Sequence, residues 1–143
     1  HDAPHKDLRR ARAAAHSIIP TTTGAAKAIT KIFPDLEGKI DGGAIRVPVS
    51  NGSMSEITFN LAESVSIEKV NNAMMDSAKL DLKGILGVIT DPIVSIDIVG
   101  SPLSSAYDAS LSRSFGKVLK ITAWYDNEAG YSNRLLELTK KVH

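Results

Sequence analysis

The sequence has 143 residues, of which 43% are hydrophobic, so it is long enough and apolar enough to form one folded domain with a hydrophobic core. Its 17 lysines and arginines nearly balance its 16 aspartates and glutamates, so we expect no nucleic-acid or membrane partner, and any anion site must be local. The absence of cysteine excludes a disulfide framework, a thiolate metal site and a cysteine nucleophile within these residues.

The first sixteen residues are rich in charge and alanine but carry no apolar stripe, and we expect them to form an exposed loop. They begin without a methionine, which indicates an internal start rather than a native N-terminus. After them, Ile18 and Ile19 predict a short buried strand, and apolar residues at helical spacing predict a short helix that follows Thr23. We expect this helix to end near Pro34, because a proline disfavours the helical conformation of the residue before it.

Two alternating segments, residues 38–50 and 55–61, predict half-buried strands. The turn-forming sequence "SNGS" lies between them, so we expect them to pair as an antiparallel hairpin. The clearest helix covers residues 64–79, where Ser66 is suited to the N-cap and an apolar stripe follows at helical spacing. The stripe consists of Ile67, Val70, Met74 and Ala78.

Strand-like runs return at residues 84–90, 93–100 and 117–125, separated by turn-forming residues. The final segment, residues 130–142, predicts a helix with an apolar side. That side consists of Tyr131, Leu135, Leu138 and Val142. Hairpins combined with a few long helices are typical of the α+β class. We therefore expect a mostly antiparallel sheet covered on one face by long helices, with an exposed N-terminal loop and a C-terminal helix.

The first candidate site is the sequence "TTTGAA", in which Thr23 and Gly24 stand at the predicted helix start. A helix N-terminus offers free backbone N–H groups and the positive end of the helix dipole, and a glycine lets an anion approach the backbone. Such a segment can hold a phosphate. The alternative is that a threonine simply caps the helix, and caps are commoner than ligand sites.

Arginines form the second candidate site. Arg46 interrupts an alternating strand and points to the face opposite Ile45, so it either faces solvent or reaches into a cleft. A guanidinium can bind a phosphate through two parallel hydrogen bonds. The cluster of Arg9, Arg10 and Arg12 near the N-terminus has the same two interpretations, a solvated surface or an anion site.

The third candidate is the junction between the strand at residues 117–125 and the final helix. Its polar residues 126–128 are suited to capping the helix. However, three of the chain's seven aromatic residues, Trp124, Tyr125 and Tyr131, lie within eight positions of one another here. The amide of Asn127 beside an aromatic wall could pair with a flat, amide-bearing ligand, because it offers both a donor and an acceptor.

Other kinds of site find little support. The four histidines have no ligand-like spacing with carboxylates, so we expect no metal site. Serines are numerous, but no Gly-x-Ser-x-Gly sequence accompanies them, so a serine nucleophile is not indicated.

Four segments together resemble a known family: "LRRARAAAHSIIPTTTGAAKAI", "RVPVSNGS", "LKGILGVITDPIVSIDI" and "WYDNEAGYSNR", in this order and spacing. They resemble the catalytic domain of phosphorylating glyceraldehyde-3-phosphate dehydrogenase, and the resemblance covers essentially the whole chain. It implies an enzyme that oxidises glyceraldehyde 3-phosphate to 1,3-bisphosphoglycerate through a cysteine thioester, which inorganic phosphate cleaves. The implied cofactor is NAD, with NADP not excluded, and the implied parent is a cytoplasmic homotetramer.

The family's nucleophilic cysteine, its histidine and its NAD-binding Rossmann domain all lie upstream of the segment matched by "RRARAAA". The resemblance therefore implies that residues 1–143 are a C-terminal catalytic domain, incomplete at its N-terminus and inactive alone. The missing cysteine agrees with this interpretation.

The resemblance also assigns residues. Thr23 and Gly24 match the site of the attacking inorganic phosphate, and Arg46 matches an arginine shared by the two phosphate positions. Arg9 best matches a second phosphate arginine, although Arg10 remains an alternative, because the alignment uses only the R-x-x-R spacing.

For the cofactor, Asn127 matches the residue that hydrogen-bonds the nicotinamide carboxamide, and Tyr131 matches an aromatic residue beside that ring.

The chain departs from the family pattern near Arg46, where Val49 replaces a common threonine and Gly52 replaces a valine. These departures weaken the distinction from erythrose-4-phosphate dehydrogenase. That relative usually varies the tyrosine of "WYDNE" and the "TGAAKA" stretch, and this chain keeps both. A further alternative is a non-catalytic module that binds partners or forms oligomers.

Overall fold

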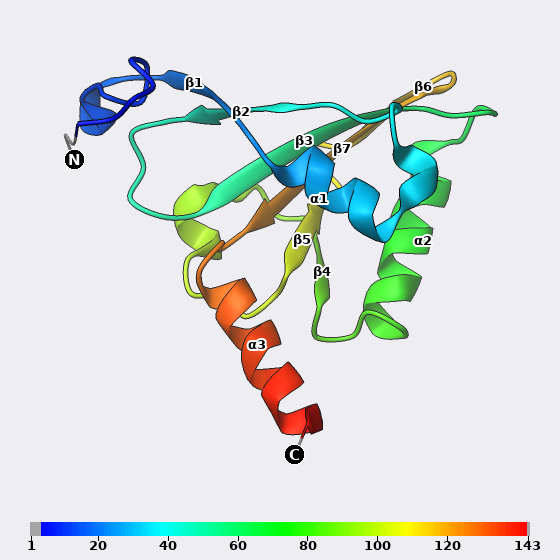
Figure 1. Ribbon diagram of the computed structural model, residues 1–143. Coiled ribbons are helices and arrows are strands. Elements are labelled where there is room, and N and C mark those ends of the chain that lie inside the picture. The colour runs from blue at the N-terminus through cyan, green and yellow to red at the C-terminus, as the bar shows by residue number, and fades with distance from the viewer. Residues whose placement is uncertain (1–3, 143) are drawn as a thin grey trace. The chain divides into compact units, whose positions relative to one another are not determined.

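The computed structural model describes residues 4–142 and consists of two compact units, His1–Ser50 and Asn51–His143 (Figure 1). The first unit contains η1 (Ala14–His16), β1 (Ile19–Thr22), α1 (Ala25–Ile32), η2 (Pro34–Leu36) and β2 (Gly43–Arg46). The second contains β3 (Ser53–Asn60), α2 (Ile67–Lys79), β4 (Leu86–Ile89), η3 (Ser95–Ile98), β5 (Ser105–Asp108), β6 (Arg113–Phe115), β7 (Val118–Tyr125) and α3 (Ala129–Val142).

The first unit is built on a two-stranded antiparallel sheet of β1 and β2. Helix α1 follows Thr23, as expected, and the backbone N–H of Phe33 donates to the Ile29 carbonyl at 2.8 Å at the end of the helix. Pro34 then begins η2, so the predicted end of the helix is confirmed. Residues 4–18 form turns and the short η1, which agrees with the predicted loop, whose residues 1–3 lie outside the described structure.

The predicted hairpin between residues 38–50 and 55–61 is wrong. Strand β2 pairs with β1, and β3 pairs with β7 over eight positions, from Ser53 opposite Tyr125 to Asn60 opposite Val118. Pro48 follows the end of β2 and has no N–H to continue a ladder. Strand β7 has the same length as β3, and eight cross-strand pairs stabilise the sheet more than a short hairpin would.

The second unit contains a five-stranded sheet with the order β3-β7-β5-β4, and β6 also pairs with β7. Only the β4 and β5 pair is parallel, so the predicted α+β class with a mostly antiparallel sheet is confirmed. The strand predicted at residues 93–100 is wrong, because η3 occupies its centre. The Asp97 carboxylate accepts a hydrogen bond from the Val94 N–H at 2.8 Å, and such a local bond competes with a strand ladder.

Helix α2 packs against one face of this sheet (Figure 1). Ser66 caps it, since its hydroxyl oxygen accepts from the Lys69 N–H at 3.3 Å, and the predicted stripe from Ile67 to Ala78 is buried or half-buried. The core beneath α2 consists of Val70, Tyr107, Leu119 and Ile121. A second cluster consists of Ile98, Ala106 and Trp124, and it places the η3 segment on the other face.

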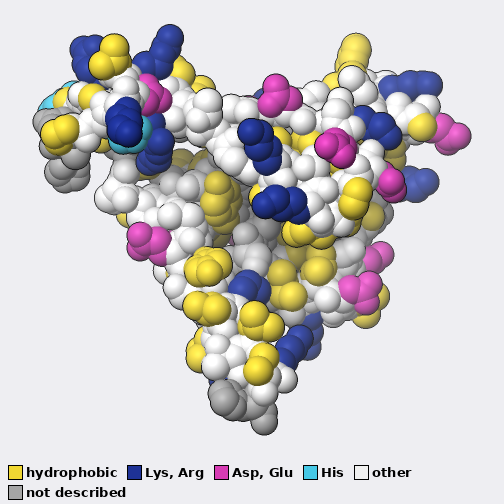
Figure 2. Space-filling model, viewed as in Figure 1, with side chains coloured by type: hydrophobic (Ala, Val, Ile, Leu, Met, Phe, Trp, Pro, Cys, Tyr) yellow, Lys and Arg dark blue, Asp and Glu magenta, His cyan; other side chains and the backbone are white. Residues whose placement is uncertain are grey.

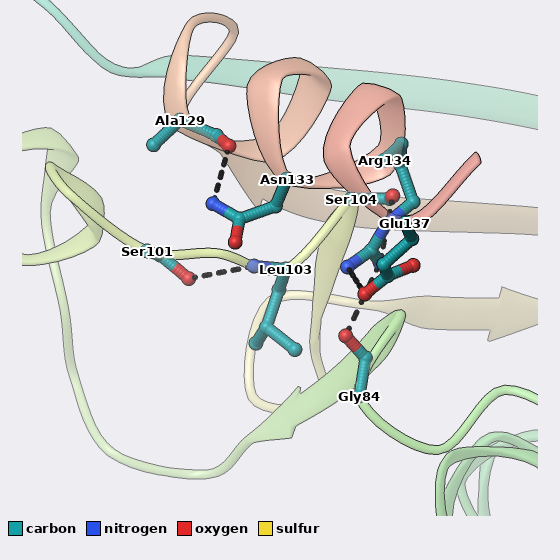
Figure 3. Close-up of polar contacts among 8 residues, drawn as sticks. All are labelled: Gly84, Ser101, Leu103, Ser104, Ala129, Asn133, Arg134 and Glu137. Carbon is teal, nitrogen blue, oxygen red and sulfur yellow. Dashed lines mark hydrogen bonds and ion pairs between the residues drawn. The ribbon is translucent and has the colours of Figure 1, made fainter. Parts of the chain in front are cut away.

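Helix α3 is attached to the sheet by its first turns. A Cβ atom on Gly130 would lie 2.6 Å from the Leu103 carbonyl oxygen, so only glycine allows this approach. Arg134 donates from Nη1 to the Gly84 carbonyl at 3.2 Å and to the Ser104 hydroxyl at 3.4 Å (Figure 3). The predicted apolar side of α3 is largely exposed, and Figure 2 shows hydrophobic side chains along this helix.

Candidate functional site

The β1–β2 ladder places Arg46 opposite Ile19, and Thr22 opposite Gly43. Directly opposed residues of antiparallel strands share a face, so Arg46 lies on the same face as Ile19 and, two positions further along β1, Thr21. Thr23 comes directly after the far end of the ladder. It lies four positions beyond Ile19, which is roughly 13 Å of extended strand.

The helix start at Thr23 and Gly24 is partly capped and partly open. The Thr23 hydroxyl oxygen accepts a hydrogen bond from the Ala25 N–H at 3.2 Å, but Thr23 is not the N-cap residue, and α1 has no side-chain cap bond. Gly24 occupies the N-cap position, and no neighbouring atom lies within 4 Å of the position that a Cβ atom on Gly24 would take. The backbone at Gly24 is therefore accessible to a small anion.

A pocket of about 220 Å³ lies at the other end of the ladder, where β1 begins. Its lining consists of Arg9, Arg12, Ser17, Ile18, Ile19 and Pro20. Arg10 is not part of this lining. Arg46 is not part of the lining either, but it stands opposite Ile19 in the ladder, so its backbone lies at the same end as this pocket. In the described part of the chain, no carboxylate forms an ion pair with Arg9, Arg12 or Arg46.

The junction after β7 is organised by Asp126, which is only 3% exposed. One carboxylate oxygen accepts from the N–H groups of Glu128 and Ala129, at 2.8 and 2.9 Å, and so caps α3. The other accepts from Gly100 N–H at 2.8 Å and from the Asn51 amide at 2.9 Å. Hydrogen bonds from the backbone of Gly100, Ala129 and Glu128 hold the pKa of Asp126 below its ordinary value.

Asn127, by contrast, is exposed at the same junction. Its carbonyl oxygen Oδ1 accepts a hydrogen bond from the Ser53 hydroxyl at 3.4 Å, and its Nδ2 has no partner among residues 4–142. Tyr131, one helical turn further, is 70% exposed. A free amide N–H group and an accessible aromatic ring therefore stand close together in the chain, and this donor set fits a flat ligand that carries a carboxamide.

Trp124 takes a structural role instead. It is 8% exposed, and its indole N–H donates to the buried carboxylate of Asp108 at 2.9 Å. Burial alone would raise the pKa of Asp108, but hydrogen bonds from Trp124, Ser110 and Leu111 outweigh it and lower the pKa. Of the aromatic wall that the sequence suggested, Trp124 thus packs into the core, and Tyr131 remains accessible.

The family described as "Glyceraldehyde 3-phosphate dehydrogenase, C-terminal domain" matches residues 1–127. The chain belongs to this family. It is 55% identical to glyceraldehyde-3-phosphate dehydrogenase of Mycolicibacterium smegmatis, and 51% identical to that of Mycobacterium leprae, each over 141 residues. The same enzyme of Priestia megaterium is 51% identical over 142 residues.

Each alignment covers 99% of the chain but only 42% of the relative. The chain thus spans less than half the length of these glyceraldehyde-3-phosphate dehydrogenases, and the resemblance to the C-terminal part of the family is confirmed.

Two residues of the junction, Asn51 and Ser53, were missed by sequence reasoning, which interpreted them as part of a hairpin turn. Their partners Asp126 and Asn127 lie 75 and 74 positions away, and no local pattern connects them. The described residues contain no group of three metal-ligating side chains, and none of their helices is long and apolar enough to cross a membrane.

Proposed function

We propose that this chain supplies the phosphate-binding and nicotinamide-orienting residues of a phosphorylating glyceraldehyde-3-phosphate dehydrogenase. The full-length protein would convert glyceraldehyde 3-phosphate, NAD and inorganic phosphate into 1,3-bisphosphoglycerate and NADH. The proposal is supported by membership of the family and by the motif resemblance that assigns the site residues. The observation that carries it is the position of Arg46 opposite Ile19, at the end of β1 where Arg9 lines a pocket, on a ladder whose other end opens at Gly24.

The phosphate groups would be held by charge and by backbone donors. Arg46 can make two parallel hydrogen bonds to one phosphate, and it forms no ion pair within residues 4–142 that would have to be broken first. Arg9, beside the same end of β1, would hold the second phosphate position. Thr23 and Gly24 would bind the attacking inorganic phosphate through the accessible start of α1.

The cofactor would be held at the second junction. NAD, or NADP, supplies the electron-accepting nicotinamide ring when bound. Asn127 would donate from Nδ2 to the carboxamide, and the exposed ring of Tyr131 would lie beside the nicotinamide. Both contacts fix the orientation of the ring, which decides the face that is presented to the substrate.

The nucleophile must come from residues outside this sequence, because the chain contains no cysteine. The chain alone would therefore show no dehydrogenase activity. We further propose that the full-length protein is a homo-oligomer, as the family resemblance implies. Exposed apolar side chains along α3, such as Leu135 and Leu138, are in line with a helix that is covered in the complete protein.

The decisive experiment replaces Arg46 with alanine in the full-length protein. Loss of a charge-assisted, bidentate phosphate contact should lower kcat/KM by about 100-fold or more, with a raised KM for inorganic phosphate. The matched control is Lys39→Ala, which removes an exposed positive charge from the same unit and should leave the kinetics unchanged. Near-normal kinetics of Arg46→Ala would reject the proposal, and assays with erythrose 4-phosphate would decide between the two aldehydes.

A further inference from the structure

Asn51, Gly52 and Ser53 form a short segment, called the clasp below, that contacts two consecutive residues at the start of α3. Asn51 Nδ2 donates to Asp126 Oδ2 at 2.9 Å, and Ser53 Oγ donates to Asn127 Oδ1 at 3.4 Å. The first bond anchors a buried carboxylate, and the second reaches an exposed amide. Two residues of the clasp thus bind the buried carboxylate of Asp126 and the exposed amide of Asn127.

Gly52 brings the clasp into close contact with η3. Its φ is +86°, a conformation that side-chain-bearing residues rarely adopt. A Cβ at this position would lie 2.7 Å from the Ser95 carbonyl oxygen and 3.4 Å from Ile98 Cγ2. The segment that follows η3 also contributes to the junction, because Gly100 N–H donates to Asp126 Oδ2 at 2.8 Å. The clasp, the η3 segment and the start of α3 are therefore joined through one carboxylate.

The register of the sheet fixes where the clasp ends. Ser53 is the first residue of β3 and stands opposite Tyr125, the last residue of β7. Asn127 follows two positions later, so the Ser53 hydroxyl reaches it across the end of the ladder. A slip of one residue would turn Ser53 to the other face of the sheet, and the eight-pair ladder opposes such a slip.

The hydrogen bond from Ser53 also determines which way the Asn127 amide is oriented. A primary amide carries its acceptor oxygen and its donor nitrogen on one carbon, and the two point in different directions within one plane. When Ser53 donates to Oδ1, the Nδ2 group is turned away from the clasp, and it has no partner in the described structure. Asn127 is then a donor to its ligand, and the matching ligand atom is a carbonyl oxygen.

On the basis of the function proposed above, we propose that the clasp is a positioning element for the nicotinamide carboxamide. Ser53 orients the Asn127 amide so that its NH₂ group meets the carbonyl oxygen of the carboxamide. Asn51 and Gly52 keep the junction in place through Asp126. The protein then recognises the carbonyl oxygen of the carboxamide and not its NH₂ group.

Two cofactor analogues test this on the unaltered full-length protein, independently of any effect of mutation on folding. The 3-acetylpyridine analogue of NAD keeps the carbonyl oxygen but lacks the NH₂ group, and the thionicotinamide analogue replaces the oxygen with sulfur, a weaker acceptor. By isothermal titration calorimetry, the acetylpyridine analogue should bind within about 3-fold of NAD, and the thionicotinamide analogue about 5- to 10-fold more weakly. The reverse order would overturn the assignment.

Variants then identify the role of Ser53. Ser53→Ala should weaken NAD binding by about 3- to 10-fold and reduce the preference for NAD over the thionicotinamide analogue by a similar factor. It should raise the KM for NAD while the KM for phosphate stays constant. Ser53→Thr keeps the hydroxyl and should restore the preference. Ser55→Ala, which changes a half-buried serine of the same strand, is the matched control and should behave as the unaltered protein.

Asn127→Ala separates failure of the clasp from failure of the proposed function. Normal NAD binding by Asn127→Ala would reject the nicotinamide role itself. Weakened binding by Asn127→Ala together with normal binding and analogue preference in Ser53→Ala would overturn the clasp alone. Ser53→Ala that weakens NAD and the thionicotinamide analogue equally would also overturn it, because a purely structural defect does not distinguish oxygen from sulfur.

Discussion

The amide of Asn51 lies 2.9 Å from the carboxylate of Asp126 and joins residues that are 75 positions apart. Together with the bond from Gly100, this contact connects the start of β3, the end of the η3 segment and the first turn of α3. The residue that bears the proposed cofactor contact, Asn127, follows directly. The geometry of that contact thus depends on a buried carboxylate next to it.

Asp126 should make the stability of the folded protein depend on pH in the acidic range. Because its pKa is lowered in the folded state, its contribution is fully present above the ordinary value of 3.8 and is lost as the pH falls through the folded value. In Asp126→Asn, one carboxylate oxygen becomes an NH₂ group that cannot accept the N–H bonds at its site. We expect a lower thermal midpoint at pH 7 and a smaller further loss of stability between about pH 5 and pH 2.

Thermal unfolding of the full-length protein, followed by circular dichroism across this pH range, measures both effects. Asp81→Asn is the control, since Asp81 is exposed and makes no side-chain hydrogen bond in the described structure. Parallel acid curves for Asp126→Asn and the unaltered protein would contradict the prediction.

Local patterns predicted part of this molecule well. The stripe from Ile67 to Ala78 and the cap at Ser66 specified α2, and the stop before Pro34 specified the end of α1, because these signals act over a few residues. The failures concern pairing. Nothing near Ser53 indicates that its strand pairs with β7, because the advantage of eight cross-strand pairs exists only in the folded sheet.

In the candidate site too, features set by local patterns were predicted, and long-range contacts were not. The local pattern placed Asn127 at a strand-to-helix junction, where the structure also has it. It could not show that Trp124 bonds Asp108 in the core, or that Asn51 and Ser53 reach the junction, because these contacts depend on long-range register.

Gly52 should be intolerant of any side chain. Gly52→Ala combines an unfavourable φ with a Cβ only 2.7 Å from a backbone oxygen, so we expect it to cost about 3 kcal/mol or more. Gly116→Ala is the matched control: its φ is also positive, at +58°, but the space beside it is open, and we expect a cost of only about 1 kcal/mol. Denaturant unfolding of the full-length protein compares the two variants. Equal costs would contradict the close contact with Ser95.

Trp124 should stabilise the fold through its N–H group as well as its ring. Trp124→Phe keeps an aromatic ring but removes the donor to Asp108, a residue that is 1% exposed. A buried acceptor without its partner costs about 1–3 kcal/mol, and the pKa of Asp108 should rise. Tyr107→Phe serves for comparison: its hydroxyl donates to Asn71, a half-buried residue that water can satisfy, so the cost should be smaller. A larger effect of Tyr107→Phe in denaturant unfolding would refute this ranking.

Arg134 should hold the first half of α3 against the sheet, mainly through its bonds to other segments. Its guanidinium donates to the Gly84 carbonyl and the Ser104 hydroxyl, and it also forms an ion pair with Glu137 at 2.7 Å. The Glu137 side chain is 53% exposed, so this pair alone should contribute less than about 1 kcal/mol.

We therefore expect Glu137→Gln to be nearly neutral and Arg134→Met to cost about 1–2 kcal/mol, since the Gly84 and Ser104 oxygens lose their donor. Hydrogen exchange of the α3 amides measures this locally, and exchange should accelerate in Arg134→Met but not in Glu137→Gln. If both variants accelerated exchange equally, the ion pair and not the contacts to Gly84 and Ser104 would hold the helix in place.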